Sequence, residues 1–248
     1  MREAVEQLLL PAECLLCRAL LSFRDSARLV CDVCRHRWRP VRAPWCARCG
    51  QPEPLFGGCR LCADWPAAFG RARSAVWLDA GARDAVHALK YGDLPRIATD
   101  LAAAMVGLDV PGLDTGLLVP VPLGRARIRT RGYNQSERLA RALGRRWGRP
   151  VVDLLVRTRE TAAQTALTPE ARLANVAGAF EVRSGKCGVR SGLSANSALR
   201  IPHSTLVLVD DVFTTGATLA EAARALELGG ATTVAAVTFG RAALPDFT

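Results

Sequence analysis

The sequence predicts an α/β protein in which a mostly parallel sheet carries helices on both faces, preceded by a small N-terminal cysteine-rich module. Three observations predict this class. Eight of the nine cysteines lie before residue 63. Most strand-like apolar runs lie after residue 70, where they alternate with amphipathic segments of helical period. Continuous apolar strands that alternate with helices are typical of a parallel sheet covered on both sides.

The shift in composition predicts a domain boundary. We expect a cysteine-rich module over residues 1–65, a join within 64–73 and an α/β domain over 72–248. Residues 183–203 are rich in Ser, Gly and basic residues and have no periodicity. We therefore expect a flexible surface insertion there, with Cys187 incidental.

The expected strands of the α/β domain are short apolar runs. They cover residues 74–79, 116–122, 151–157, 205–210 and 232–239.

The expected helices lie between these strands. They cover residues 82–91, 95–107, 134–148 and 216–230. Pro95 suits the first turn of its helix, and glycines close the last two helices.

Charge and targeting signals narrow the function. The 248 residues carry a formal charge of +10 and a pI of about 9.7, which favours partners that bear phosphate. Nearly all of this charge is arginine, with Lys90 and Lys186 as the two lysines, and such usage is also typical of a GC-rich genome. No secretory signal or membrane-spanning stretch is evident, so we expect a cytoplasmic protein with reduced or metal-bound cysteines.

The cysteines predict two zinc sites. They form four C-x2-C pairs: Cys14/Cys17, Cys31/Cys34, Cys46/Cys49 and Cys59/Cys62. Two such pairs supply the four thiolates of a closed tetrahedral site, so we expect two structural Zn²⁺ ions. Sequential pairing gives a double zinc ribbon, and the spacing leaves a cross-braced pairing open. His36, close to Cys34, is expected to be a solvated polar residue.

Tryptophans interleave with arginines in this module. Trp38, Trp45 and Trp65 could stack on unpaired bases or could cover the small core of a zinc ribbon. We favour the core interpretation.

The stretch "LVLVDDVFTTGAT" (206–218) predicts a ligand site. Asp210 and Asp211, at the end of a strand, can accept hydrogen bonds from the two hydroxyls of a ribose diol. Residues Thr214, Thr215, Gly216, Ala217 and Thr218 then form a hydroxyl-rich turn into a helix, and such a turn cradles a phosphate. An ordinary strand–turn–helix explains one acid and one threonine, but not the whole set. The stretch resembles the 5-phosphoribosyl 1-diphosphate (PRPP) motif of type I phosphoribosyltransferases.

The stretch "VPVPLGRARIRTRGYNQSERLA" (119–140) is the second signal. Its arginines at alternate positions, Arg125, Arg127, Arg129 and Arg131, could bind a pyrophosphate or form a solvated basic loop. Together with the cysteine module, the PRPP turn and residues Gln164, Leu167, Arg172 and Asn175, this stretch resembles the ComF family. That family comprises phosphoribosyltransferase-like proteins associated with competence for DNA uptake. The resemblance covers about residues 14–182 and 205–241, and the insertion departs from it.

The resemblance implies a type I phosphoribosyltransferase-like domain behind a double zinc ribbon, and transfer of a phosphoribosyl group from PRPP with Mg²⁺ to an unidentified acceptor. Asp210 and Asp211 would be catalytic. The residues implied in PRPP binding are Lys90, Arg125, Arg129, Arg131, Thr214, Thr215, Gly216, Ala217 and Thr218, and the sequence does not show which arginine contacts the pyrophosphate. No general base is evident, since His87 and His203 look incidental.

Two alternatives remain open at this point. The protein could sense PRPP without catalysis. It could also be an accessory of DNA uptake whose zinc module binds single-stranded DNA.

Overall fold

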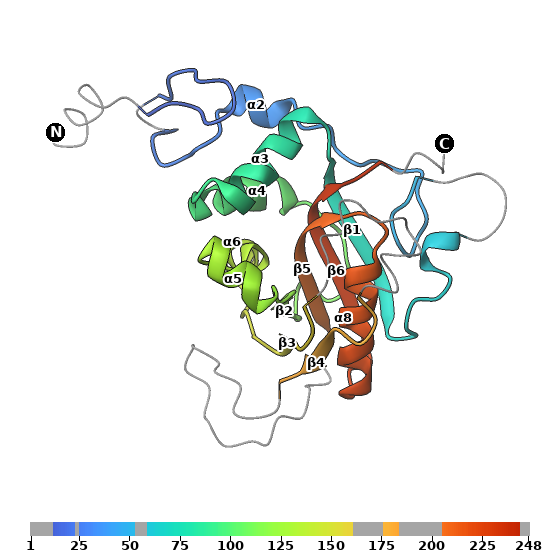
Figure 1. The fold of residues 1–248 in the computed structure, drawn as a ribbon. Coiled ribbons are helices and arrows are strands. Elements are labelled where there is room, and N and C mark those ends of the chain that lie inside the picture. The colour runs from blue at the N-terminus through green and yellow to red at the C-terminus, as the bar shows by residue number, and fades with distance from the viewer. Residues whose placement is uncertain (1–11, 23–24, 53–58, 161–175, 184–204, 244–248) are drawn as a thin grey trace.

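A computed structural model describes residues 12–22, 25–52, 59–160, 176–183 and 205–243 (Figure 1). The cysteine-rich module comes first and the α/β part follows. None of the helices in these ranges combines the length and apolar character that spanning a bilayer requires.

The central sheet has four strands in the order β1-β6-β5-β2, and every pairing between them is parallel. The strands are β1 (Phe69–Trp77), β6 (Val234–Arg241), β5 (Leu206–Phe213) and β2 (Leu117–Pro120). β5 lies between two partners and is buried at every position except Val212. Its last residues therefore emerge at the carboxyl edge, where open α/β sheets bind ligands.

Three helices cover one face of this sheet (Figure 1). They are α3 (Ala80–Tyr91), α4 (Ala98–Met105) and α6 (Gln135–Trp147), and a 3-10 turn, η3 (Pro95–Ile97), leads into α4. Their buried residues form one apolar cluster with alternate residues of β5 and β6. Asn134 caps α6 by accepting a hydrogen bond from the Ser136 N–H at 3.0 Å.

The opposite face carries α8 (Ala217–Leu228) and a small antiparallel ribbon of β3 (Leu155–Arg157) and β4 (Phe180–Val182). The other alternate residues of β5 and β6 pack here. The predicted fold class, a parallel sheet with helices on both faces behind a cysteine-rich module, is confirmed.

Some elements differ from the expectation. β1 begins at Phe69, so residues 69–73 of the expected join belong to the sheet. The strand expected over 151–157 is reduced to Leu155–Arg157, because Val151 makes only an isolated bridge to Leu118.

The arginine-rich stretch is a helix, α5 (Arg125–Arg131), although the sequence pattern did not predict a helix there. Arginine and alanine are good helix formers, and a carboxylate helps at the N-terminus, where the Ala126 N–H donates to Glu160 at 2.9 Å. Gly132, with φ +77°, ends the helix.

The cysteine-rich module contacts both sides of the sheet. It contains the helix α2 (Asp32–His36) and the 3-10 turn η2 (Arg60–Cys62). Between its two halves, Pro40 pairs with Val76, so the connecting chain covers the free edge of β1.

Candidate functional site

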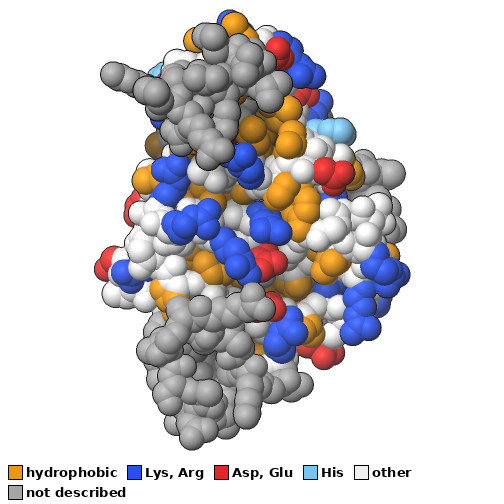
Figure 2. Space-filling model, turned by 90° about the vertical axis from the view of Figure 1, so that its left-hand side faces the viewer, with side chains coloured by type: hydrophobic (Ala, Val, Ile, Leu, Met, Phe, Trp, Pro, Cys, Tyr) orange, Lys and Arg blue, Asp and Glu red, His pale blue; other side chains and the backbone are white. Residues whose placement is uncertain are grey.

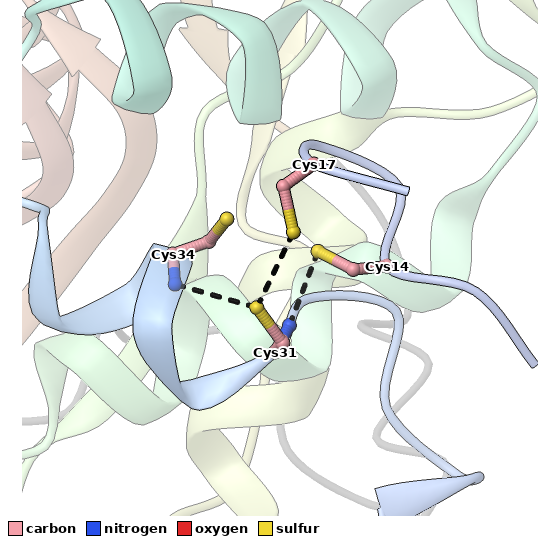
Figure 3. Close-up of side chains that lie close together, drawn as sticks. All are labelled: Cys14, Cys17, Cys31 and Cys34. Carbon is pink, nitrogen blue, oxygen red and sulfur yellow. Dashed lines mark hydrogen bonds between the residues drawn. The ribbon is translucent and has the colours of Figure 1, made fainter. Parts of the chain in front are cut away.

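The eight cysteines of the module form two separate clusters of four. The sets are Cys14, Cys17, Cys31 and Cys34, and then Cys46, Cys49, Cys59 and Cys62, and within each set all sulfurs lie within 4.8 Å of one another. Figure 3 shows the four sulfurs of the first set pointing toward a common centre. Cys31 is the N-cap of α2, and its Sγ accepts a hydrogen bond from the Cys34 N–H at 3.4 Å.

The spacing of the sulfurs fits a tetrahedral zinc ion. Sγ–Sγ distances are 3.7 Å for Cys17–Cys31, 3.7 Å for Cys46–Cys62 and 3.5 Å for Cys49–Cys59. Four sulfurs at about 2.3 Å from a tetrahedral Zn²⁺ lie about 3.8 Å apart. Each set is closed by four thiolates, which is typical of structural zinc.

The ligand sets follow the order of the sequence, so the cross-braced alternative is excluded. His36 belongs to neither set. Its ring Nδ1 lies 2.8 Å from the carbonyl oxygen of Asp32, and the residue is exposed, as predicted from the sequence.

The tryptophans of the module belong mainly to the core. Trp38 and Trp65 are buried, and Trp38 packs edge-on against Phe239 at 5.0 Å. Trp45 is half-buried under the guanidinium of Arg73, 5.2 Å from the ring centroid. The core interpretation is confirmed for Trp38 and Trp65, whose rings are not available to stack on bases.

The two adjacent carboxylates at the end of β5 are held by different helices. Ser136 of α6 donates its hydroxyl to Asp210 Oδ1 at 2.7 Å. Lys90 of α3 forms an ion pair with Asp211, with 2.8 Å between Nζ and Oδ2. Both carboxylates are buried, so each depends on its helix for compensation.

Burial also shifts the titration of these groups. Burial, reinforced by the charge of Asp211, raises the pKa of Asp210 to about 7, although the hydrogen bond from Ser136 opposes the shift. Burial acts to lower the pKa of Lys90, but the carboxylates of Asp211 and Asp210 outweigh it, so that pKa lies above its ordinary value. Lys90 is therefore a cation at neutral pH.

The turn after β5 leads directly into the N-terminus of α8. Gly216 has φ +80° and precedes the first residue of α8. A Cβ there would lie 2.7 Å from the Phe213 ring, so the position requires glycine. The Ala217 N–H approaches Thr215 Oγ1 at 3.4 Å, and both residues are buried.

A cavity of about 460 Å³ joins these parts. Of the residues predicted for the site, those that line it are Lys90, Arg131, Asp210, Asp211, Thr214, Gly216 and Thr218. Thr215 and Ala217 belong to the same turn, but they are buried and do not line the cavity.

The arginines of α5 do not all line the same cavity, because they lie on a helix and not in an extended loop. Residues four apart share a helix face, so Arg127 and Arg131 line the cavity together. Arg125 lines a second cavity instead, and Arg129 borders neither of the two. In an extended loop, side chains at alternate positions would all face the same side. The sequence alone therefore did not predict that these arginines line different cavities.

Other residues of the cavity were not assigned a role from the sequence. Ser136 and Arg157 line it, and so does His87, which looked incidental. The sequence gives only a weak indication that Ser136 belongs to the site: it lies two residues after Asn134, the N-cap of α6, at the end of the arginine-rich stretch. His203 and the family-like residues Gln164, Leu167, Arg172 and Asn175 lie outside the described residues.

A second cavity of about 640 Å³ runs along α6. Its arginines are Arg125, Arg141, Arg145, Arg149, Arg157 and Arg183. Two carboxylates, Glu137 and Asp153, also line it, so positive charge dominates.

Comparison with known proteins agrees with this architecture. A family model described as the double zinc ribbon domain matches residues 5–65. Two curated proteins called DNA utilization protein YhgH are 31% identical (Escherichia coli O6:H1) and 32% identical (Salmonella typhimurium) over 239 residues, which is 92% of this chain and 96% of each relative. The competence protein ComFC of Bacillus subtilis is 28% identical over 249 residues, covering 92% of this chain and 94% of that protein.

Fold and cysteine sites thus define an α/β protein with an N-terminal double zinc ribbon. The chain belongs to the ComF family.

The cysteine sets predict the metal content. Denatured wild-type protein should release about two zinc ions per chain, and Cys49→Ser about one, because a set of three thiolates binds zinc more weakly. Cys187→Ser, at the ninth cysteine, is the matched control and should retain both ions. Atomic absorption of the purified proteins measures this, and equal zinc loss from the two variants would contradict the assignment.

The raised pKa of Asp210 predicts a pH dependence of stability. Its pKa is about 7 in the folded chain against 3.8 in the unfolded one, so the unfolded state loses this proton first as the pH rises. The contribution to stability is full below about pH 4 and is lost as the pH rises to about 7. Asp210→Asn has no such proton and should gain stability relative to wild type across this window. Urea denaturation of both proteins measures the difference, with zinc content checked at each pH because acid protonates the thiolate ligands, and a constant difference from about pH 5 to pH 7 would contradict the shift.

Proposed function

We propose that the protein binds PRPP with Mg²⁺ and transfers the phosphoribosyl group to an acceptor. The observation that carries this proposal is the cavity of about 460 Å³, which joins two carboxylates, a glycine-containing turn at a helix N-terminus and several cations. Each part matches one part of PRPP.

The ligand would lie along the cavity in a defined direction. The ribose diol would donate hydrogen bonds to Asp210 and Asp211, and the 5-phosphate would bind the turn at Gly216. The pyrophosphate would then face Lys90, Arg127 and Arg131 on the α3 and α5 side. The carboxylates at the end of β5 are also the oxygen donors that Mg²⁺ prefers, directly or through water, and the ion would neutralise pyrophosphate charge.

The described residues would contribute positioning and electrostatics. When the bond between C1 and the pyrophosphate breaks, positive charge develops on the ribose ring. Asp210 and Asp211, held beside the ring, would stabilise that charge. Lys90 now pairs with Asp211 at 2.8 Å, so this ion pair would rearrange to let the diol approach.

Calorimetric titration with PRPP and Mg²⁺ tests the binding step. Wild type should show one Mg²⁺-dependent site, and Asp210→Ala should weaken it by about tenfold or more, since the side chain that accepts a hydrogen bond from the diol is removed. Asp84→Asn is the control, because Asp84 is an exposed carboxylate on the same helix as Lys90. Equal affinity of all three proteins would sink the proposal.

Pyrophosphate release separates an enzyme from a PRPP sensor. Release that depends on an added acceptor supports transfer, and saturable binding without release across a broad acceptor panel supports a sensor. Asp211→Asn should abolish release in the first case.

The second cavity favours a second function, the binding of single-stranded nucleic acid. Its six arginines face one glutamate and one aspartate, which form ion pairs with Arg141 and Arg183 respectively. Arg141 and Arg145 lie four residues apart on α6, about 6 Å along the helix axis, and Arg149 follows just beyond the end of that helix. Figure 2 shows Lys and Arg side chains gathered on the face that lies to the left in Figure 1, the side of α5 and α6.

This assignment moves the nucleic-acid surface away from the zinc module, whose Trp38 and Trp65 rings are buried. The names of the relatives, DNA utilization protein and competence protein, support a link to the uptake or use of DNA.

Charge reversal along α6 tests this function. Arg141→Glu with Arg145→Glu should weaken binding of a fluorescent single-stranded oligonucleotide by about tenfold or more, and should reduce the salt slope by about 0.7 for each phosphate that the variant no longer neutralises. Arg37→Glu with Arg42→Glu is the matched control on exposed arginines of the zinc module. If the control variant loses affinity and the α6 variant does not, the nucleic acid binds to the zinc module and not to the second cavity.

A further inference from the structure

The two zinc clusters differ in what they touch. Cys14 and Cys34 of the first cluster belong to the apolar core that includes α3 and α4. Cys49 and Cys62 of the second belong to the other core, which includes Phe213 and α8. The second cluster therefore shares a core with Phe213 and α8, which directly flank the turn at residues 214–216, here called the phosphate turn.

Trp65 connects the second cluster to the turn. It follows Cys62 by three residues, and its ring stacks on Phe69 at 4.1 Å and lies 6.3 Å from the Phe213 ring. A Cβ on Gly216 would lie 3.1 Å from this indole. The α-carbon of Gly216 is thus enclosed between Trp65 and Phe213.

Arg48 fixes the backbone that carries Trp65. It lies between the ligands Cys46 and Cys49, and its guanidinium donates to the carbonyls of Cys62 at 3.0 Å, Trp65 at 3.3 Å, Pro66 at 2.8 Å and Phe69 at 3.0 Å. These hydrogen bonds connect the Cys46/Cys49 pair of ligands to the Cys59/Cys62 pair and to the start of β1.

Arg241 makes the second connection. It is 1% exposed at the end of β6, and it donates to the carbonyl of Cys49 at 2.9 Å and to Gln51 Oε1 at 2.7 Å. Its guanidinium lies 4.3 Å from the centroid of the Phe213 ring. Arg241 thus spans the distance from a zinc ligand to the residue before the turn.

The second zinc cluster compensates the positive charge of Arg241. Among the described residues, no carboxylate forms an ion pair with it. Four thiolates around one Zn²⁺ carry a net charge of about −2, which compensates a buried guanidinium.

We propose that the second zinc cluster is part of the scaffold of the phosphate turn. Arg48, Trp65 and Arg241 are positioning residues that hold Phe213 and Gly216 in the conformation that accepts a phosphate ester. Loss of the ion from the second cluster lowers the affinity for PRPP, and loss from the first does not. This inference rests on the proposed binding of PRPP.

Opening one cluster at a time in the full-length protein tests the inference. The variants are Cys59→Ser with Cys62→Ser, and as a matched control Cys14→Ser with Cys17→Ser, and each should retain about one zinc ion. The first readout needs no ligand: it is hydrogen exchange at residues 213–218, compared with residues 98–105 of α4. The second readout is the Kd for PRPP with Mg²⁺.

Opening the second cluster should speed exchange at 213–218 by about tenfold or more, and should raise the Kd by a similar factor. Opening the first should affect α4 and leave both readouts of the turn within about twofold of wild type. Equal effects of the two openings on the turn, or no effect of either, would overturn the inference.

Arg241→Met separates positioning from loss of folding. It keeps all eight thiols and should keep both zinc ions, yet it should speed exchange at the turn and weaken PRPP binding. Native exchange at 213–218 in this variant would overturn the proposal. If wild type itself does not bind PRPP, the proposed function fails, while the exchange comparison still decides whether the cluster supports the turn.

Discussion

Two adjacent carboxylates end a strand that is buried along most of its length. Asp210 and Asp211 are 9% and 4% exposed, and leaving such groups without partners would cost several kcal/mol each. Compensation comes from Ser136 of α6 and Lys90 of α3. Both helices must therefore pack at the carboxyl edge of the sheet, and their packing also forms the walls of the cavity.

The zinc module packs against the α/β sheet and is not simply appended to it. Its connecting chain covers the edge of β1, Trp38 packs on Phe239 of β6, and Arg241 of β6 is bonded to the backbone of Cys49. Each zinc cluster thus contributes to a different core on its own side of the sheet. A buried guanidinium beside a zinc–thiolate cluster explains why a basic residue is tolerated at the end of a central strand.

The two proposed functions are compatible in space. The two cavities share Pro122, Leu123 and Arg157, so a nucleic-acid strand bound along α6 would pass beside the proposed PRPP site. Arg157 lies between them and contacts the Phe180 ring at 5.2 Å, which places β3 and β4 at the boundary.

Local patterns in the sequence determined a large part of this protein. Apolar periodicity predicted the alternation of strands and helices, the C-x2-C spacing predicted two zinc sites, and the acids followed by a threonine–glycine turn predicted a site at the end of β5. These signals are local, because each depends on residues that are neighbours in the chain. Only the tertiary structure decided which cysteines share an ion, that the arginines of α5 divide between two cavities, and that Ser136, His87 and Arg157 join the site. It also placed Trp65 and Arg241 against the turn. Such contacts depend on how elements far apart in the sequence pack together, so residue spacing within one segment cannot predict them.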